Sequence, residues 1–272
     1  MIPVSQKHPT EQVKEQTEAI AEGVKQELTE SRRPWYYLSH AARVLLIIYA
    51  VQLSLFALLA FWVHLNPVNS IDLTITREFQ ESSASWLKIS MEVVSYAGST
   101  FVLPVLVLLT ALLFWFGGLR LEAIFVVALS VISLGINTLV KILVERPRPN
   151  SHFVDVFQAA TGQSFPSGHV MAYMAFWGLL FSFGIILFKG VRWWRILLLV
   201  ISALFVALIG PSRIYLGDHW ASDVLGSYLI GGVLLGITLW IYLKLKERGV
   251  LETERARNRS LTSQRFRSFS RK

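Results

Sequence analysis

Residues 44–65 read VLLIIYAVQLSLFALLAFWVHL, a run without Asp, Glu, Lys or Arg. A helix needs about 20 mainly apolar residues to cross the hydrocarbon core of a bilayer. Backbone polar groups in lipid must be satisfied within the segment, so a run that is continuously apolar favours a helix over a barrel strand. This stretch therefore predicts a membrane-spanning helix.

Five further apolar runs predict an all-α bundle of six transmembrane helices. Hydrophobic residues make up 53% of the 272-residue chain and charged residues only 16%, against about 25% charged in an ordinary soluble domain. Helices of a soluble bundle would show polar faces, and these runs show few. The further runs are Val93–Leu119, Ala123–Val140, Val170–Phe188, Ile196–Ser212 and Val224–Leu243.

The net charge of +8 is concentrated at the carboxyl end of the chain. From Lys244 to Lys272 there are ten Lys and Arg against three acids. Basic residues directly after an apolar segment are typical of a cytoplasmic anchor facing anionic lipid, and no nucleic-acid motif accompanies them. We expect an amino-terminal helical segment (1–40), a membrane domain (41–245) and a basic, disordered tail (246–272).

Basic residues in the short connections predict the orientation of the bundle. Ten Lys and Arg flank the spans on the side of the two termini and six on the other side, which predicts that both termini are cytoplasmic. Between the first two spans, Ile71–Ser90 mixes apolar and charged residues and predicts an interfacial amphipathic helix on the outer face. The chain has no cysteine, which excludes disulfides and thiolate chemistry.

Three polar clusters interrupt the apolar pattern. They are Lys141 with Arg148-Pro149, then Pro166-Ser167-Gly168-His169, and finally Ser212-Arg213 with His219 and Asp223. Ionisable residues at the ends of membrane spans are costly and mark function. Because no span separates the first two clusters and two spans separate the last two, all three lie on the same side, opposite the cytoplasm.

The residue types in these clusters suggest an anionic ligand. Lys141, Arg148 and Arg213 are cations without matching acids in the same motifs, and a bound phosphate or pyrophosphate would relieve their repulsion. Arginine offers bidentate geometry to phosphate oxygens. Ser167 and Gly168 precede a helix whose free N–H groups can bind phosphate.

A histidine–carboxylate pair at helical spacing suggests phosphoryl transfer. His219 and Asp223 are four residues apart, so a carboxylate can fix the imidazole tautomer and leave the other nitrogen as a nucleophile. His169 is then the natural general acid for the leaving oxygen. A metal site built from both histidines, Asp218 and Asp223 is an alternative that the nearby cations disfavour.

Several other polar residues invite plainer interpretations. Glu145 and Arg146 are expected to be loop charges that pair locally, and Asn137 to make an interhelical hydrogen bond. Asp218 could tune His219 or lie in solvent.

Taken together, the three clusters resemble the type 2 phosphatidic acid phosphatases, the integral-membrane lipid phosphate phosphatases. The family pattern is K-x6-R-P, P-S-G-H and S-R-x5-H-x3-D. The chain reads KILVERPRP from Lys141, PSGH from Pro166 and SRIYLGDHWASD from Ser212, with every fixed position present. The similarity covers roughly residues 40–245.

The resemblance implies metal-independent hydrolysis without a cofactor. His219 would be the nucleophile, Asp223 would orient it and His169 would protonate the leaving group. The phosphate would be held by five residues, namely Lys141, Arg148, Ser167, Gly168 and Arg213.

The motifs specify phosphate rather than the lipid attached to it. Phosphatidate is the first expected substrate, with undecaprenyl diphosphate and phosphatidylglycerophosphate as alternatives. A non-catalytic lipid-phosphate binder or transporter is the rival from another class, and a metal-dependent hydrolase is a further one. The partners expected are the lipid substrate and the surrounding membrane lipid.

Overall fold

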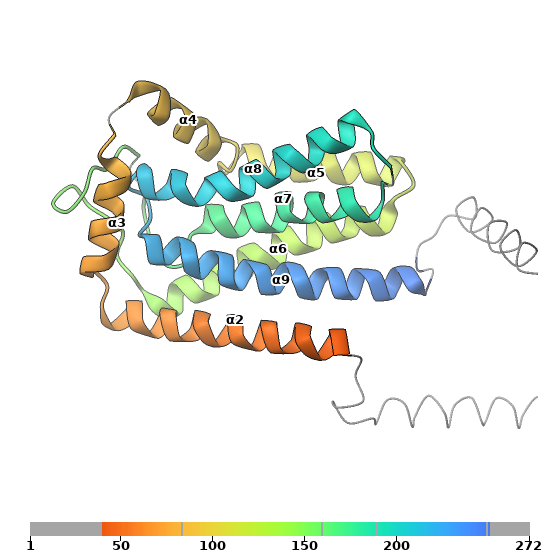
Figure 1. Ribbon diagram of the computed structural model, residues 1–272, viewed down its shortest axis with the longest axis horizontal. Helices are drawn as coiled ribbons and strands as arrows, with labels where there is room; N and C mark the ends of the chain where they lie inside the picture. Colours follow the sequence, from red (N-terminus) through yellow and green to blue (C-terminus); the bar gives the residue numbers. More distant parts are fainter. Residues whose placement is uncertain (1–39, 83, 159, 189, 249, 251–272) are drawn as a thin grey trace, which may run out of the picture. The chain divides into compact units, whose positions relative to one another are not determined.

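The computed structural model describes residues 40–82, 84–158, 160–188, 190–248 and 250, and Figure 1 shows its helices in sequence order. These residues form helices and connecting segments without a strand, so the all-α prediction is confirmed. The amino-terminal segment 1–40 and the basic tail 246–272 lie almost wholly outside the described residues. The helices are α2 (His40–Leu65), α3 (Ser70–Gln80), α4 (Ser85–Tyr96), α5 (Val102–Phe116), α6 (Arg120–Val144), α7 (Gly168–Ile186), α8 (Trp193–Tyr215) and α9 (Ala221–Glu247).

By its internal contacts the chain divides into two compact units, Met1–Val51 and Gln52–Lys272. The described part of the first unit is the beginning of α2, whose Leu46 and Ile47 are exposed. The second unit contains the rest of α2 and all the other described helices, and the three polar clusters belong to it.

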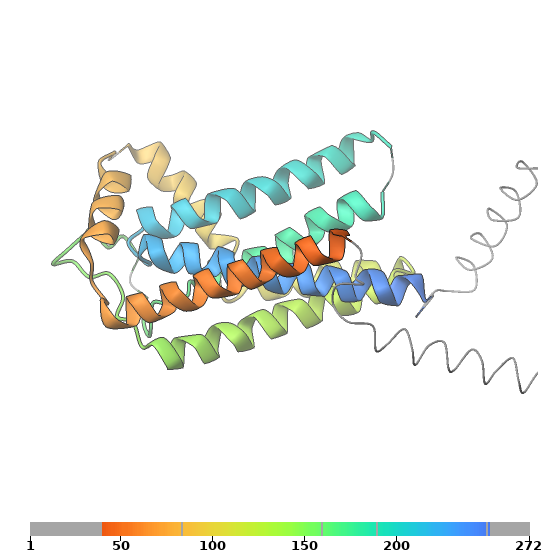
Figure 2. The same ribbon diagram turned by 60° about the horizontal axis from the view of Figure 1, so that its bottom comes forward.

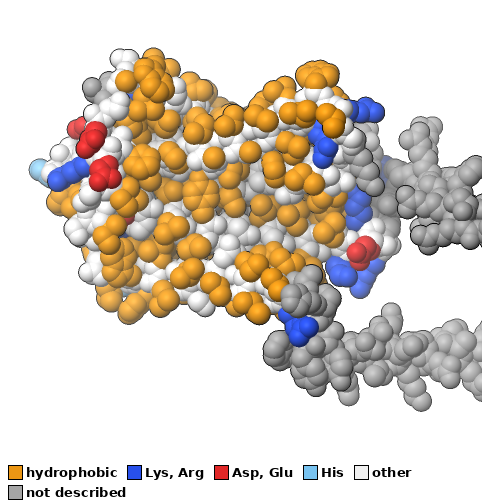
Figure 3. Space-filling view, in the orientation of Figure 1, with side chains coloured by type: hydrophobic (Ala, Val, Ile, Leu, Met, Phe, Trp, Pro, Cys, Tyr) orange, Lys and Arg blue, Asp and Glu red, His pale blue; other side chains and the backbone are white. Residues whose placement is uncertain are grey.

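Five helices are long and apolar enough to cross a membrane. They are Ala42–Leu65 of α2 and the whole of α6, α7, α8 and α9. Many of their large hydrophobic side chains are exposed, among them Leu58, Leu134 and Leu143. Figure 3 shows hydrophobic side chains over most of the visible surface, with charged side chains gathered toward its two ends. Such a surface suits lipid rather than water, and the protein is an integral multi-pass membrane protein.

The second predicted span is interrupted in the structure. The run Val93–Leu119 begins in α4, leaves the helix after Tyr96 and becomes helical again as α5. Ser99 Oγ, in the segment between the two helices, accepts the N–H of Val102 at 3.3 Å. The 15 residues of α5 span about 22 Å at 1.5 Å per residue, less than the bilayer core of about 30 Å. The break is at Gly98, where a side chain would collide with the ring of Tyr173.

The single interfacial helix predicted over Ile71–Ser90 is instead two helices. α3 ends at Gln80 and α4 begins at Ser85. Asn69 caps α3 by accepting the backbone N–H of Asp72 at 2.9 Å. The side chains of Asp72 and Thr76 are buried, because α3 packs against α8 and α9 rather than lying free on a surface.

The core forms around α7, which packs against α6, α8 and α9. Its buried side chains include Phe176, Leu179 and Phe183, which join residues of α6 and α9 in one hydrophobic cluster. The helices α6, α7, α8 and α9 alternate in direction, so the end of α6, the start of α7, the end of α8 and the start of α9 meet at one end of the bundle (Figures 1 and 2). α3 lies across that end, and all three polar clusters are found there.

Candidate active site

The first cluster begins at the end of α6. Glu145 terminates the helix in a left-handed conformation (φ 52°) and donates its N–H to Lys141 O. The half-buried Lys141 side chain donates to the carbonyl of Gln163 at 2.8 Å, which ties the helix end to the segment before α7.

The second cluster forms the amino terminus of α7. Ser167 is the fully buried N-cap residue, and its Oγ has no hydrogen-bond partner among the described residues. Gly168 approaches α6 so closely that a Cβ would lie 3.3 Å from Asn137 Oδ1. Asn137 donates to Pro166 O at 3.1 Å, just before α7, and to Met171 Sδ at 3.3 Å within α7, so the expected interhelical hydrogen bond is confirmed. His169 follows in the first turn and is half-buried.

The third cluster joins the end of α8 to the start of α9. Arg213 is buried in the last turn of α8, and the chain then turns at Gly217, which has a positive φ of 73°. A side chain at Gly217 would collide with the backbone of Asp155. Asp223 is the third residue of α9 and accepts the N–H of Trp220 at 2.9 Å, which fixes the carboxylate at the helix start.

His219 and Asp223 lie together as their spacing predicts. His219 Nδ1 is 3.5 Å from Asp223 Oδ2, and both side chains are almost fully buried. Ser164 Oγ donates to the same carboxylate oxygen and lies 3.4 Å from His219 Nδ1. Burial lowers the pKa of His219 to about 3, although Asp223 opposes the shift. The imidazole is therefore neutral near pH 7, with Nδ1 turned toward Asp223 and Nε2 on the other side.

Arg148 faces that second nitrogen. Its guanidinium donates to the carbonyl of Asp218 at 2.9 Å and lies 3.3 Å from His219 Nε2. Burial lowers the pKa of Arg148, and the nearby carboxylates of Asp218 and Asp223 oppose that shift. The first and third clusters thus meet at the histidine ring, whereas neither Lys141 nor His169 hydrogen-bonds to His219 in the described structure.

The expectation that the cations of the three clusters have no matching acids is wrong for Arg213, because Asp218 pairs with it. Asp218 is buried rather than solvated and forms an ion pair with Arg213. Burial raises the pKa of Asp218, while Arg213 and Arg148 oppose the rise.

Three of the motif side chains nevertheless keep a buried donor without a partner among the described residues. These donors are Arg148 Nε, Ser167 Oγ and Arg213 Nε. A buried donor without a hydrogen-bond acceptor destabilises the folded protein by about 1–3 kcal/mol. Such a group in a folded protein therefore calls for an explanation, such as a ligand that binds there. All three belong to residues predicted to hold phosphate, and oxygens of a bound phosphate could accept from each of them.

A family comparison covers the same part of the chain. The model of the PAP2 superfamily matches residues 119–247, which contain all three clusters. Over these residues the chain is similar to the PAP2 superfamily.

The chain is also similar to individual proteins. The chain is 28% identical to phosphatidylglycerophosphatase B of Bacillus subtilis (strain 168), over 70% of this chain and 93% of that protein. It is 37% identical to phosphatidylglycerophosphatase B of Escherichia coli (strain K12), over 31% of each chain. The crystal structure of a transmembrane PAP2-type phosphatidylglycerolphosphate phosphatase from Bacillus subtilis superposes with a TM-score of 0.61 at 25% identity, covering 72% of this chain and 96% of that one.

Arg146 belongs to this side-chain cluster, although the sequence did not predict it. Expected to be a loop charge, it is fully buried and forms ion pairs with Asp72 and Asp223, both at 2.6 Å. It also donates to Ser222 Oγ and Pro67 O. Glu145 beside it is exposed. The only available signal was the doubled Arg-Pro of residues 146–149, and the partner Asp72 lies far away in the sequence.

The geometry of these side chains also bears on the alternative of a metal site formed by His169, His219, Asp218 and Asp223. In the described ranges, no group of three His, Cys, Asp or Glu side chains is arranged to hold a metal ion. Asp218 is engaged by Arg213, and Asp223 is engaged by Arg146 and Ser164.

Proposed function

We propose that this protein is a lipid phosphate phosphatase that works through a phosphohistidine on His219. The observation that carries the proposal is the state of that ring. It is buried, which favours the neutral imidazole, with Nδ1 oriented by Asp223 and Nε2 facing the guanidinium of Arg148. A nucleophile activated in this way, beside a phosphate-binding arginine, is what phosphoryl transfer requires.

The first step is transfer of the phosphoryl group to the enzyme. His219 Nε2 attacks phosphorus, and the bond from phosphorus to the lipid oxygen breaks. The bound phosphate dianion offsets the nearby cations and so favours protonated His169, which gives its proton to the leaving oxygen. Asp223 stabilises the positive charge that develops on the imidazole. Lys141, Arg148 and Arg213, together with Ser167 Oγ and the N–H groups at the start of α7, hold the phosphate oxygens.

The second step releases the phosphate. Neutral His169 accepts a proton from water, the resulting hydroxide attacks phosphorus, and the bond to His219 Nε2 breaks. Inorganic phosphate leaves, and both histidines return to their starting states. Each step uses a group that this chain supplies, in keeping with a metal-independent reaction.

Phosphatidylglycerophosphate is the first substrate to test. Phosphatidate and undecaprenyl diphosphate follow it. The two bacterial relatives are named for phosphatidylglycerophosphate, which favours it over phosphatidate, the first expectation from the motifs. A cavity of about 490 Å³ lined by α5, α6 and the start of α7 reaches His169 and could take the lipid chain.

The proposed orientation places the site on the extracytoplasmic side. Basic residues gather at the opposite end of the helices, with Arg120 at the start of α6, Arg195 in the first turn of α8 and Lys244 in the last turn of α9. The positive-inside rule then assigns that end, and both termini, to the cytoplasm. This topology requires α5 to serve as a sixth, short span. Local thinning of the bilayer, or residues flanking α5, would compensate for the difference between the length of α5 and the thickness of the bilayer core.

A lipid-phosphate binder or transporter is the rival proposal. The oriented histidine disfavours it, because binding a phosphate needs cations and N–H groups but no His219–Asp223 pair. The position of the polar residues at one end of the helices, rather than at mid-depth, disfavours a transporter as well.

The deciding experiment is phosphate release by the full-length protein in detergent with EDTA present. The panel contains the three lipids, and the variants are His219→Ala and His152→Ala, the latter an exposed loop histidine. We expect release by the wild type and His152→Ala, and loss of release in His219→Ala. Lipid binding without turnover would favour the rival, and activity that requires an added metal would contradict the mechanism.

A further inference from the structure

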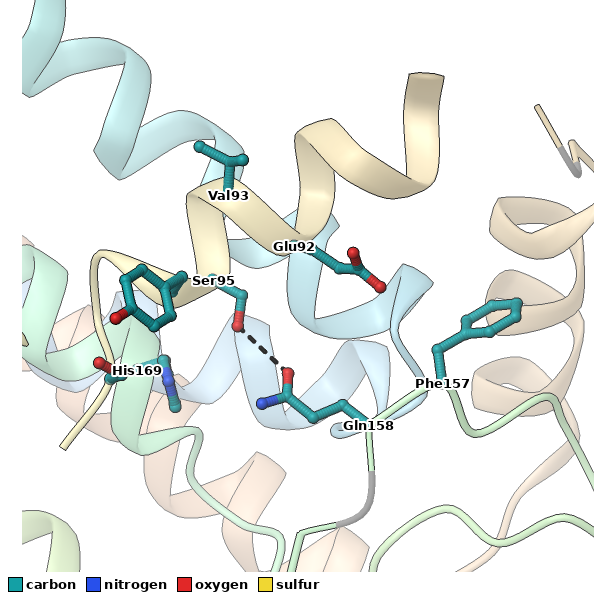
Figure 4. Close-up of a pocket in the computed structure, with 8 residues that line it drawn as sticks. Glu92, Val93, Ser95, Phe157, Gln158 and His169 are labelled. Atoms are coloured by element: carbon teal, nitrogen blue, oxygen red, sulfur yellow. Dashed lines mark hydrogen bonds between the residues drawn. The ribbon is translucent and has the colours of Figure 1, made fainter. Parts of the chain in front are cut away.

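A second cavity reaches His169 from the polar side of the site. It measures about 440 Å³ and is lined by α4 residues Glu92 and Ser95, by Phe157 and Gln158 of the loop before α7, and by His169 itself. Figure 4 shows these side chains around the opening. The apolar cavity between α5 and α6 also includes His169. The proposed general acid therefore lies where the two cavities meet.

Gln158 connects this second cavity to the proposed phosphate site. Its Oε1 accepts from Ser95 Oγ and from an NH of Arg213, both at 3.4 Å. Because the carbonyl oxygen is used by these two donors, the amide NH2 is left over. Figure 4 shows that nitrogen on the side of Gln158 that faces His169, and it donates to no described residue.

Glu92 supplies a hydrogen-bond acceptor, whereas the Gln158 amide supplies a donor. Its side chain is exposed at the cavity, and it makes no hydrogen bond or ion pair with the described residues. In Figure 4 the carboxylate is directed toward Phe157 and Gln158. The cavity is therefore lined by an amide donor and a carboxylate acceptor. A hydroxyl group can use both kinds of partner, because it accepts one hydrogen bond and donates another.

We propose that this cavity binds the part of the leaving group next to the phosphate, and that Gln158 and Glu92 recognise a free hydroxyl there. The inference rests on the proposed function, in which His169 protonates the leaving oxygen and so marks the leaving-group side. The substrate class is a lipid phosphomonoester of a polyol, with a hydroxyl on the carbon beside the ester carbon.

The proposal separates this class from lipids that lack such a hydroxyl. A prenyl group attached directly to the phosphate oxygen would leave the donor and the acceptor of the cavity unpaired. A diphosphate would bring a second anion toward the Glu92 carboxylate, which is unfavourable. In a diacylated glycerol phosphate the neighbouring hydroxyl is esterified, so it cannot donate to Glu92.

The test compares two lipids that differ only in that hydroxyl. They are a 1-acylglycerol 3-phosphate and its 2-deoxy analogue with the same acyl chain, each assayed with the full-length protein in detergent. For the wild type we expect kcat/KM to be about tenfold higher for the hydroxyl-bearing lipid than for the deoxy lipid. This preference is modest because the cavity is open to solvent. We expect that ratio to fall to about twofold or less in Gln158→Leu, and to fall also in Glu92→Gln.

Two further variants keep the result interpretable. Glu78→Gln changes an exposed carboxylate on α3 outside the cavity and should retain the wild-type ratio. If Gln158→Leu disturbs Arg213 and does not fold, Glu92→Gln still decides, because its side chain has no partner to lose. A wild-type ratio near one, or an unchanged ratio in Glu92→Gln, overturns the inference. Absence of any release that depends on His219 would instead overturn the proposed function, and the inference with it.

Discussion

Arg146 and Asp223 form an ion pair at 2.6 Å in which neither side chain is exposed. Each oxygen of the carboxylate has its own partners. Oδ1 accepts from Arg146, whereas Oδ2 accepts from Ser164 and the Trp220 N–H and faces His219. The second NH2 group of Arg146 pairs with Asp72 of α3. The carboxylate that orients the proposed nucleophile is thus fixed by a residue 77 positions earlier in the chain.

Removing the arginine should destabilise the protein strongly. Arg146→Met leaves two buried carboxylates, Asp72 and Asp223, without their cation, and breaking a buried pair in this way costs about 3–5 kcal/mol. We expect a matching fall in the free energy of unfolding measured in detergent. Lys244→Met removes an exposed cation and should change it by less than about 0.5 kcal/mol.

A double variant separates the charge effect from a loss of packing. Arg146→Met combined with Asp72→Asn leaves one uncompensated carboxylate instead of two, so it should recover part of the lost stability. If the double variant is less stable than Arg146→Met alone, the ion-pair explanation is wrong.

The helical bundle and the motif residues could be predicted from the sequence. The apolar runs mark α2 and α6 to α9 because lipid exposure demands uninterrupted hydrophobic side chains. The break between α4 and α5 could not be predicted in the same way, since Gly98 and Ser99 hardly alter the hydropathy of their run. It depends on the packing of Gly98 against Tyr173, which is a tertiary contact.

The burial of Arg146 and Asp218 was missed for a related reason. Both are charged residues in loops, and loop charges are mostly solvated. Their burial depends on partners brought together only by folding, namely Asp72 of α3 for Arg146 and Arg213 at the end of α8 for Asp218. The pairing of His219 with Asp223 was predictable because it is local, at four residues' separation.

His169 should matter most for lipids with poor leaving groups. His169→Asn removes the proposed acid, and we expect kcat to fall by about 10²–10⁴ for a lipid alkoxide. An aryl phosphate such as 2,4-dinitrophenyl phosphate needs no protonation and should lose about tenfold or less. Steady-state rates on both substrates test this, with His152→Asn as the exposed control. Equal losses on the two substrates would remove His169 from the acid role.

Asp218 should weaken anion binding in the free enzyme, because its carboxylate neutralises Arg213. Asp218→Asn keeps the shape but removes the competing negative charge, worth about 1 kcal/mol or more at this range. We expect the inhibition constant of orthovanadate to fall about fivefold. Asp155→Asn changes an exposed acid in the loop before α7 and should leave it unchanged. An inhibition constant that rises in Asp218→Asn would mean that the carboxylate positions Arg213 rather than competing with the ligand.

His219 should make the protein less stable in acid. Its folded-state pKa of about 3 lies below the value of about 6.5 for an unfolded chain, so between these pH values the unfolded chain binds one more proton. The stabilisation is complete above pH 6.5 and is lost as the pH falls toward 3. By linkage, this one residue should remove about 2–3 kcal/mol between pH 7 and pH 4.5. Unfolding free energies at the two pH values should therefore differ less in His219→Gln than in the wild type, while His152→Gln follows the wild type. If wild type and His219→Gln lose equal stability, the imidazole is not held neutral, and the nucleophile would have to be deprotonated before each turnover.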